Sequence, residues 1–116
     1  MLRLIGGRGN AVQHFYRTDP EAFTELADIL KALAHPQRLC IAKALCEKQQ
    51  SNVTEMQICL GEAQSTVSQH LAKLKAAKII TGKREGTNIY YSLYDEKKRQ
   101  IVQSLVNGFF SEEEKP

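Results

Sequence analysis

Residues 64–74 combine an apolar stripe with a face of hydrogen-bonding side chains. Val67, Leu71 and Leu74 are spaced i, i+4 and i+7, which predicts one buried face of a helix. Glutamine pairs with adenine edges, serine and threonine bind bases or phosphates, and lysine neutralises phosphate. The segment therefore indicates a helix that reads the major groove of DNA, although many ordinary surface helices share this composition. Its polar members are Gln64, Ser65, Thr66, Ser68, Gln69, His70 and Lys73.

A shorter helix is predicted immediately before this one. Asn52 has the side chain of a helix N-cap, and Glu55 follows three residues later, as in a capping box. Gly61 to Ala63 then interrupt the helix before the next one begins. Two helices joined by a short turn that contains glycine are typical of a helix-turn-helix.

Residues 79–94 predict a β-hairpin after the two helices. The segment Ile89 to Tyr94 is rich in β-branched and aromatic residues, and a turn containing Gly86 precedes it. A hairpin that follows a helix-turn-helix makes a winged helix. We expect its polar tip to contact DNA through Lys83, Arg84, Thr87 and Asn88.

The distribution of charge agrees with a nucleic-acid partner. The chain has 116 residues, of which 42% are hydrophobic and 25% charged, with a formal net charge of +3. These values are typical of one globular domain. Residues 64–88 hold five basic side chains and one carboxylate, a net charge of +4, so the remainder is slightly acidic. Positive charge is thus concentrated where phosphates would lie; a solvated basic face is the alternative.

Three further helices complete the predicted fold. Asp19 followed by Pro20 predicts a helix start, Pro36 begins the next helix, and Asp95 caps the last one. The fold class is therefore mainly α with a small β-hairpin: a dimeric winged helix-turn-helix with five helices. Residues 1–18 are expected to form a flexible arm, residues 19–110 the DNA-binding and dimerisation domain, and residues 111–116 an acidic tail. In the second helix we expect Leu39, Ile41, Ala42, Leu45 and Cys46 to point inward.

The last helix carries a wide apolar stripe that needs a covering surface. The first helix of the same chain covers some of it, and a second chain can cover the rest, since palindromic DNA sites favour two-fold dimers. The predicted dimer interface consists of Phe23, Leu26, Leu30, Ile101, Val102, Leu105 and Phe109.

Taken together, three segments resemble the ArsR/SmtB family of bacterial winged-helix repressors. They are Leu30 to Leu39 (LKALAHPQRL), Gln64 to Ile80, and Lys83 to Leu93 (KREGTNIYYSL). The resemblance spans about residues 22–106 and implies a homodimer that binds double-stranded operator DNA. It also implies a repressor whose affinity for DNA changes with an inducer, and a dimer interface built from the first and last helices.

The family's usual metal sites do not match this chain. Where the soft-metal sensors carry Cys-x-Cys, the sequence has Asn52, Val53 and Thr54. The zinc and nickel sensors use Asp and His on the last helix, but here Lys97 follows Asp95 where the His is expected, and no histidine follows His70. A zinc site needs about four N, S or O ligands. We therefore expect no metal and no cofactor, and an inducer that is a small molecule, a redox signal or absent.

The three cysteines have several interpretations. Cys46 falls on the apolar stripe of its helix and is expected in the core, and Cys59 follows Met56 by three residues. A free cysteine often fills a core as a small hydrophobe, while thiol sensing and metal ligation are the alternatives. Cys40 lies off the apolar stripe and is the best candidate for a thiol sensor. His35 is expected at a helix start.

The sequence excludes several other classes. It contains no phosphate-binding glycine loop, nucleophile elbow or His-Glu metal motif, so we expect no enzyme. It shows no signal peptide and no apolar run that could span a membrane. An odd number of cysteines without Cys-x-x-Cys favours the reducing cytoplasm. The main alternative function is a winged-helix protein-interaction module that does not bind DNA.

Overall fold

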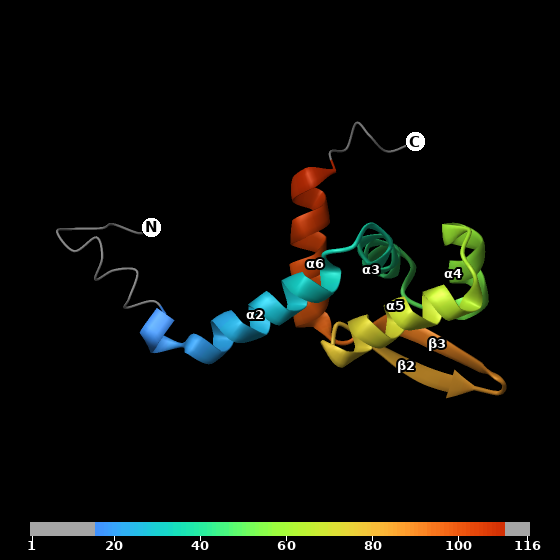
Figure 1. The fold of residues 1–116 in the computed structure, drawn as a ribbon, viewed down its shortest axis with the longest axis horizontal. Helices are drawn as coiled ribbons and strands as arrows, with labels where there is room; N and C mark the ends of the chain where they lie inside the picture. The colour runs from blue at the N-terminus through green and yellow to red at the C-terminus, as the bar shows by residue number, and fades with distance from the viewer. Residues whose placement is uncertain (1–15, 111–116) are drawn as a thin grey trace.

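The structure is a computed structural model that describes residues 16–110. The elements run α2 (Pro20–Leu33), α3 (Pro36–Lys48), β1 (Ser51–Asn52), α4 (Val53–Leu60), α5 (Gln64–Ala76), β2 (Ile80–Glu85), β3 (Asn88–Leu93) and α6 (Glu96–Phe109). Figure 1 shows the β2–β3 hairpin beside α5, and α2 crossing α6 and then extending away from the other elements. No helix within residues 16–110 is long and apolar enough to cross a membrane.

The helices begin where the sequence predicts, because local side chains satisfy their first amide groups. Asp19 accepts a hydrogen bond from the amide of Ala22 at 3.1 Å, with Pro20 in the first helical position. His35 caps α3, as expected for a helix-start group: its Nδ1 accepts from the amide of Gln37 at 3.0 Å. Asp95 caps α6 in the same way.

One apolar core joins all layers of the fold. Its most deeply buried side chains come from α3, α5, α6 and the start of the hairpin, and they are Leu45, Val67, Leu74, Ile79, Ile80 and Val102. Val67, Leu71 and Leu74 are all buried, which confirms the stripe predicted for α5. Cys46 is half-buried against this core. Leu39 was expected to point inward, but it is exposed, because Ile41, Ala42 and Leu45 already form the core face of α3.

The sheet is antiparallel and has the strand order β1-β3-β2. The hairpin register pairs Ile80 with Leu93 and Glu85 with Asn88, so the predicted hairpin is confirmed. The additional strand β1 pairs Ser51 with Tyr91 and was missed by the sequence analysis. Two residues are too few for strand periodicity to be visible.

Two further differences concern the chain ends. Residues 16–18 are helical, so the described residues contain one helical segment more than the five predicted helices. These three residues belong to the predicted arm, and they form a short helical segment separate from α2, which begins at Pro20. The rest of the arm (residues 1–15) and the acidic tail (residues 111–116) lie outside the described residues.

Candidate nucleic-acid interface

The polar face of α5 points to solvent. Its apolar stripe packs on the core, which leaves Gln64, Ser65, Ser68, Gln69 and Lys73 exposed and Thr66 half-buried. The first turn of α5 holds no carboxylate. Exposed amides, hydroxyls and a lysine are groups that donate to and accept from base edges and phosphates. The chemistry expected of a groove-reading helix is therefore available on this surface.

His70 is the exception. It was predicted to contact DNA, but only 8% of its surface is exposed. Its Nε2 atom lies 3.0 Å from Oε1 of Gln37, whose amide nitrogen donates to Glu62 at 2.8 Å. His70 follows Val67 by three residues, and this spacing turns it toward the core side of α5. The imidazole therefore positions α5 against α3 and is withdrawn from the predicted DNA-contacting set.

Local contacts define both ends of α4, the helix that precedes α5. In α4 the Asn52 side chain accepts from the Glu55 amide at 2.9 Å, and Glu55 accepts from the Asn52 amide at 3.1 Å, which confirms the predicted capping box. The Glu55 pKa is lowered chiefly by its hydrogen bond to the Asn52 backbone. Gly61 ends α4 with φ +67°, a left-handed conformation that favours glycine. The capping box therefore fixes where α4 begins, and Gly61 fixes where it ends before α5.

The hairpin presents a basic tip beside α5. Lys83 pairs with Tyr90 and Arg84 with Ile89, and both cationic side chains are exposed. Gly86 has φ +66° and makes the tight turn, so Thr87 and Asn88 lie at the exposed tip. The strand β2 packs against α5, and Figure 1 shows the hairpin beside that helix, so the basic tip and the exposed polar residues of α5 are neighbours on the surface. Such an arrangement suits a groove flanked by phosphates.

The α2–α6 face is a second exposed surface, and it is apolar. A groove of about 830 Å³ runs along it, lined mainly by Leu30, Leu33, Leu39, Leu105, Phe109 and Phe110. Phe23 and Leu26 are also exposed on α2, while Ile101 is half-buried. Val102 was predicted to lie in the dimer interface but is 1% exposed. With Val106 one turn later, it faces the protomer's own core and cannot reach a second chain.

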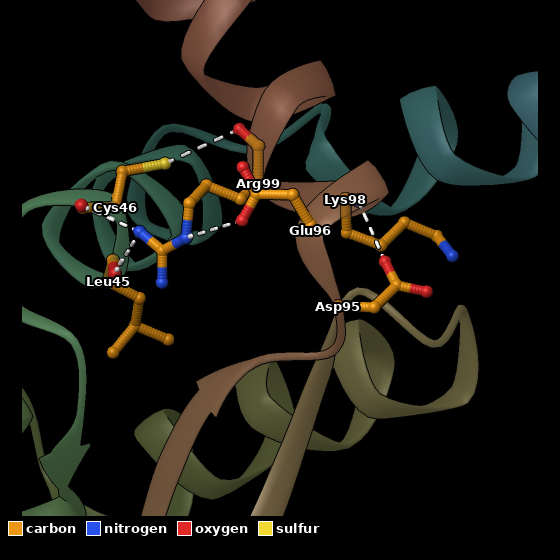
Figure 2. A network of polar contacts seen from close by, with 6 residues as sticks. All are labelled: Leu45, Cys46, Asp95, Glu96, Lys98 and Arg99. Atoms are coloured by element: carbon orange, nitrogen blue, oxygen red, sulfur yellow. Dashed lines mark hydrogen bonds and ion pairs between the residues drawn. The ribbon is translucent and has the colours of Figure 1, made fainter.

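An arginine on α6 joins this helix to the end of α3 (Figure 2). Arg99 donates through Nη1 to the carbonyl oxygens of Cys46 at 2.8 Å and Leu45 at 3.4 Å. These carbonyls belong to the last turns of α3, where helical partners run out. Glu96, one turn earlier on α6, lies 3.9 Å from Nε of Arg99 and forms an exposed ion pair with it. Arg99 has no signal in the sequence, because its partners are backbone atoms more than 50 residues away.

The cysteines show no conventional metal centre. In residues 16–110 no three His, Cys, Asp or Glu side chains come close enough to hold a metal ion. Cys40 and Cys59 are exposed, so core filling is wrong for these two residues. Burial raises the pKa of the half-buried Cys46 thiol, whose sulfur lies 4.0 Å from the carbonyl oxygen of Arg99.

Two consecutive helices, the second with an exposed polar face, followed by a basic hairpin, define a winged helix-turn-helix protein. Residues 35–81 match the family described as bacterial regulatory protein, arsR family. The chain is 42% identical over 79 residues to the transcriptional repressor PagR of Bacillus anthracis, covering 68% of this chain and 79% of PagR. It is 36% identical over 107 residues to the biofilm growth-associated repressor of Xylella fastidiosa strain Temecula1, covering 91% and 93%.

The structure gives the same assignment. A homodimeric winged helix-turn-helix DNA-binding domain from Mycobacterium bovis superposes with a TM-score of 0.70 at 28% identity, covering 78% of this chain and 82% of that one. The chain belongs to the arsR family of bacterial regulatory proteins. The resemblance is therefore confirmed, and so is the expected fold class of a mainly helical winged helix-turn-helix with a small hairpin, with one helical segment more than the five expected. Because the family consists of transcriptional regulators, the prediction that this chain is not an enzyme is also confirmed.

Proposed function

We propose that the chain is a repressor that binds a palindromic operator as a homodimer in the bacterial cytoplasm. The observation that carries the proposal is the exposed polar face of α5 beside the basic tip of the hairpin. Repressor names among the relatives support the same function. We assign base contacts to Ser68 and Gln69, and phosphate contacts mainly to Lys73 and Arg84. Further contacts are expected from Gln64, Ser65, Thr66, Lys83, Thr87 and Asn88.

The dimer is proposed from the α2–α6 face. Phe23 and Leu30 are 48% and 44% exposed in the single chain, and Phe109 is 80% exposed. A monomeric protein rarely leaves so large an apolar patch in water. Burying this face against a second copy would place two α5 helices related by a two-fold axis. Such a dimer matches half-sites about 34–36 Å apart, one turn of DNA.

The domain division at residues 19 and 110 stays part of the proposal, with the helical start moved forward to residue 16. Contacts run between α6 and both α3 and β3, so the dimer helix and the DNA-reading elements share one core. Residues 16–110 are thus proposed to bind DNA and dimerise as a unit.

The experiment that tests the proposal selects an operator from random duplexes and then measures affinity across a salt series. Gln69→Ala should cost about 1–3 kcal/mol on the selected site and relax its sequence preference. Arg84→Ala should weaken all duplexes alike and reduce the salt slope by about one unit, since one phosphate contact is lost.

Two matched variants serve as controls. Gln103→Ala removes the same amide from the exposed surface of α6 and should leave DNA affinity unchanged. Arg84→Lys keeps the charge and should retain the salt slope. If Gln69→Ala and Arg84→Ala act identically on selected and random DNA, the assignment of base and phosphate contacts is wrong. A wild-type chain that binds no duplex at low salt is instead the protein-interaction module.

A further inference from the structure

Cys40 on α3 and Cys59 on α4 line the same small cavity. Its volume is about 80 Å³, and its apolar wall includes Leu45, Met56 and Leu60. Both cysteines are exposed in the single chain, and Cys40 also borders the apolar groove of the α2–α6 face. Cys59 lies outside that groove, so the cavity stays open to a small molecule on the α4 side. Helix packing brings these two residues together, since they come from separate helices and form no Cys-x-x-Cys motif.

The two thiols interact with each other. Burial is the largest cause that raises the pKa of the Cys40 thiol, and Cys59 raises this pKa further through charge repulsion and a side-chain hydrogen bond. The amine of Lys43 acts in the opposite direction and favours the thiolate. The shared cavity wall places the two cysteines near each other.

Cys46 has different surroundings, although it is also on α3. Its thiol lies against the carbonyl oxygen of Arg99, and the charges that act on it belong to Arg99, Glu47 and Lys43. It therefore provides a natural control: a cysteine on the same helix whose neighbours are not thiols.

We propose that Cys40 and Cys59 form a reversible modification site, an intrachain disulfide made by reaction with a peroxide. One thiolate attacks a peroxide oxygen, the O–O bond breaks, and the sulfur becomes a sulfenic acid while the departing oxygen leaves as water. The second thiolate attacks this sulfur, the S–S bond forms, and the S–O bond breaks to release a second water. Two thiols lose two electrons and two protons, and hydrogen peroxide is reduced to two water molecules. A thiol reductant reverses the bond by exchange.

The position of the pair gives the bond a route to α5. Cys59 is two residues before Gly61, which ends α4, and the adjoining Glu62 accepts a hydrogen bond from Gln37 on α3. Gln37 also holds His70 on α5. A covalent link between α3 and the end of α4 constrains the spacing on which these hydrogen bonds depend. That this changes operator affinity rests on the function proposed above, whereas formation of the disulfide does not.

The test treats the full chain with hydrogen peroxide, blocks the remaining thiols and measures intact mass and linked peptides. We expect a loss of about two hydrogen atoms per chain and one peptide pair joining Cys40 to Cys59. Cys46→Ser should behave like the wild type, while Cys40→Ser and Cys59→Ser should each abolish the link. Both substituted positions are exposed, so the variants should fold. A link that includes Cys46, or one between two chains, overturns the assignment.

Two further measurements separate chemistry from regulation. The rate of disulfide formation should rise with pH through the range above neutrality, because the thiolate is the nucleophile; a constant rate overturns the mechanism. The oxidised chain should bind the operator at least about tenfold more weakly, a typical coupling between two sites. If the oxidised and reduced chains bind the operator with equal affinity, the proposed effect of the disulfide on DNA binding is wrong, while the disulfide itself is not. Failure of the reduced chain to bind DNA overturns the proposed function and leaves the mass result standing.

Discussion

The hydrogen bonds around His70 determine which of its nitrogen atoms carries the proton. Glu62 only accepts when ionised, so the amide nitrogen of Gln37 must donate to it and the Gln37 oxygen must accept from His70 Nε2. Neutral His70 therefore leaves Nδ1 unprotonated, and that atom is buried without a hydrogen-bond partner among the described residues. Protonation at Nδ1 would create a charged donor with no acceptor.

Burial is accordingly the largest cause that lowers the pKa of His70, and the nearby His35 and Arg38 lower it further. Lys73 acts in the same direction, and only Glu62 opposes them. In the unfolded chain the imidazole has an ordinary pKa of about 6.5. As pH falls below that value, His70 binds a proton in the unfolded state but stays neutral in the folded state. The free energy of unfolding therefore decreases. One proton per chain sets the limiting slope at about 1.4 kcal/mol per pH unit, until the folded pKa is reached.

The assay is urea unfolding at one fixed protein concentration, from pH 8 to pH 5, for wild type and His70→Gln. Glutamine cannot titrate and can still donate to Gln37. Above about pH 6.5 the difference in unfolding free energy between the two proteins should be constant. Below it, the wild type should lose stability relative to the variant by up to the limiting slope. Parallel stability curves over the whole range would refute the buried, neutral state of His70.

Three other predictions concern the remaining contacts. Leu105→Asp should make the protein monomeric in sedimentation and abolish operator binding, because it places an unpaired charge in the proposed dimer groove; Gln103→Asp, on the same helix, should remain dimeric. Arg99→Ala should lower the free energy of unfolding by about 1–3 kcal/mol, measured in urea, since two α3 carbonyls lose their donor. Calorimetric titration with zinc should show no tight binding, and nanomolar stoichiometric binding would contradict the interpretation of Asn52 to Thr54 and of α6.

Features set by neighbouring residues could be predicted from the sequence. Asp19, Asn52 and Asp95 cap helices through hydrogen bonds that reach only three residues along the chain. The buried stripe of α5 and the hairpin follow from periodicity and turn chemistry in the same local way.

Features that depend on distant partners could not be predicted. Ser51 becomes a strand residue only because Tyr91 lies opposite. The burial of His70 was partly visible, since its spacing from Val67 and Leu74 extends the apolar stripe, but its polarity favoured a surface role. The periodicity of Val102 fits both the dimer interface and the core of its own chain. Only the packing of α6 on α3 shows that it belongs to the core. The proximity of Cys40 and Cys59 has no signal in the sequence at all.

The short strand β1 has a mechanical consequence. It ends at Asn52, the residue that caps α4, and it is hydrogen-bonded to β3 at Tyr90 and Tyr91. The hairpin therefore does not move independently of the helix-turn-helix. The pairing of β1 with β3 joins it to the residue that caps α4 through backbone hydrogen bonds. The distance between α5 and the basic tip of the hairpin is therefore constrained by the fold, and the protein itself determines how far apart their two contacts with DNA lie.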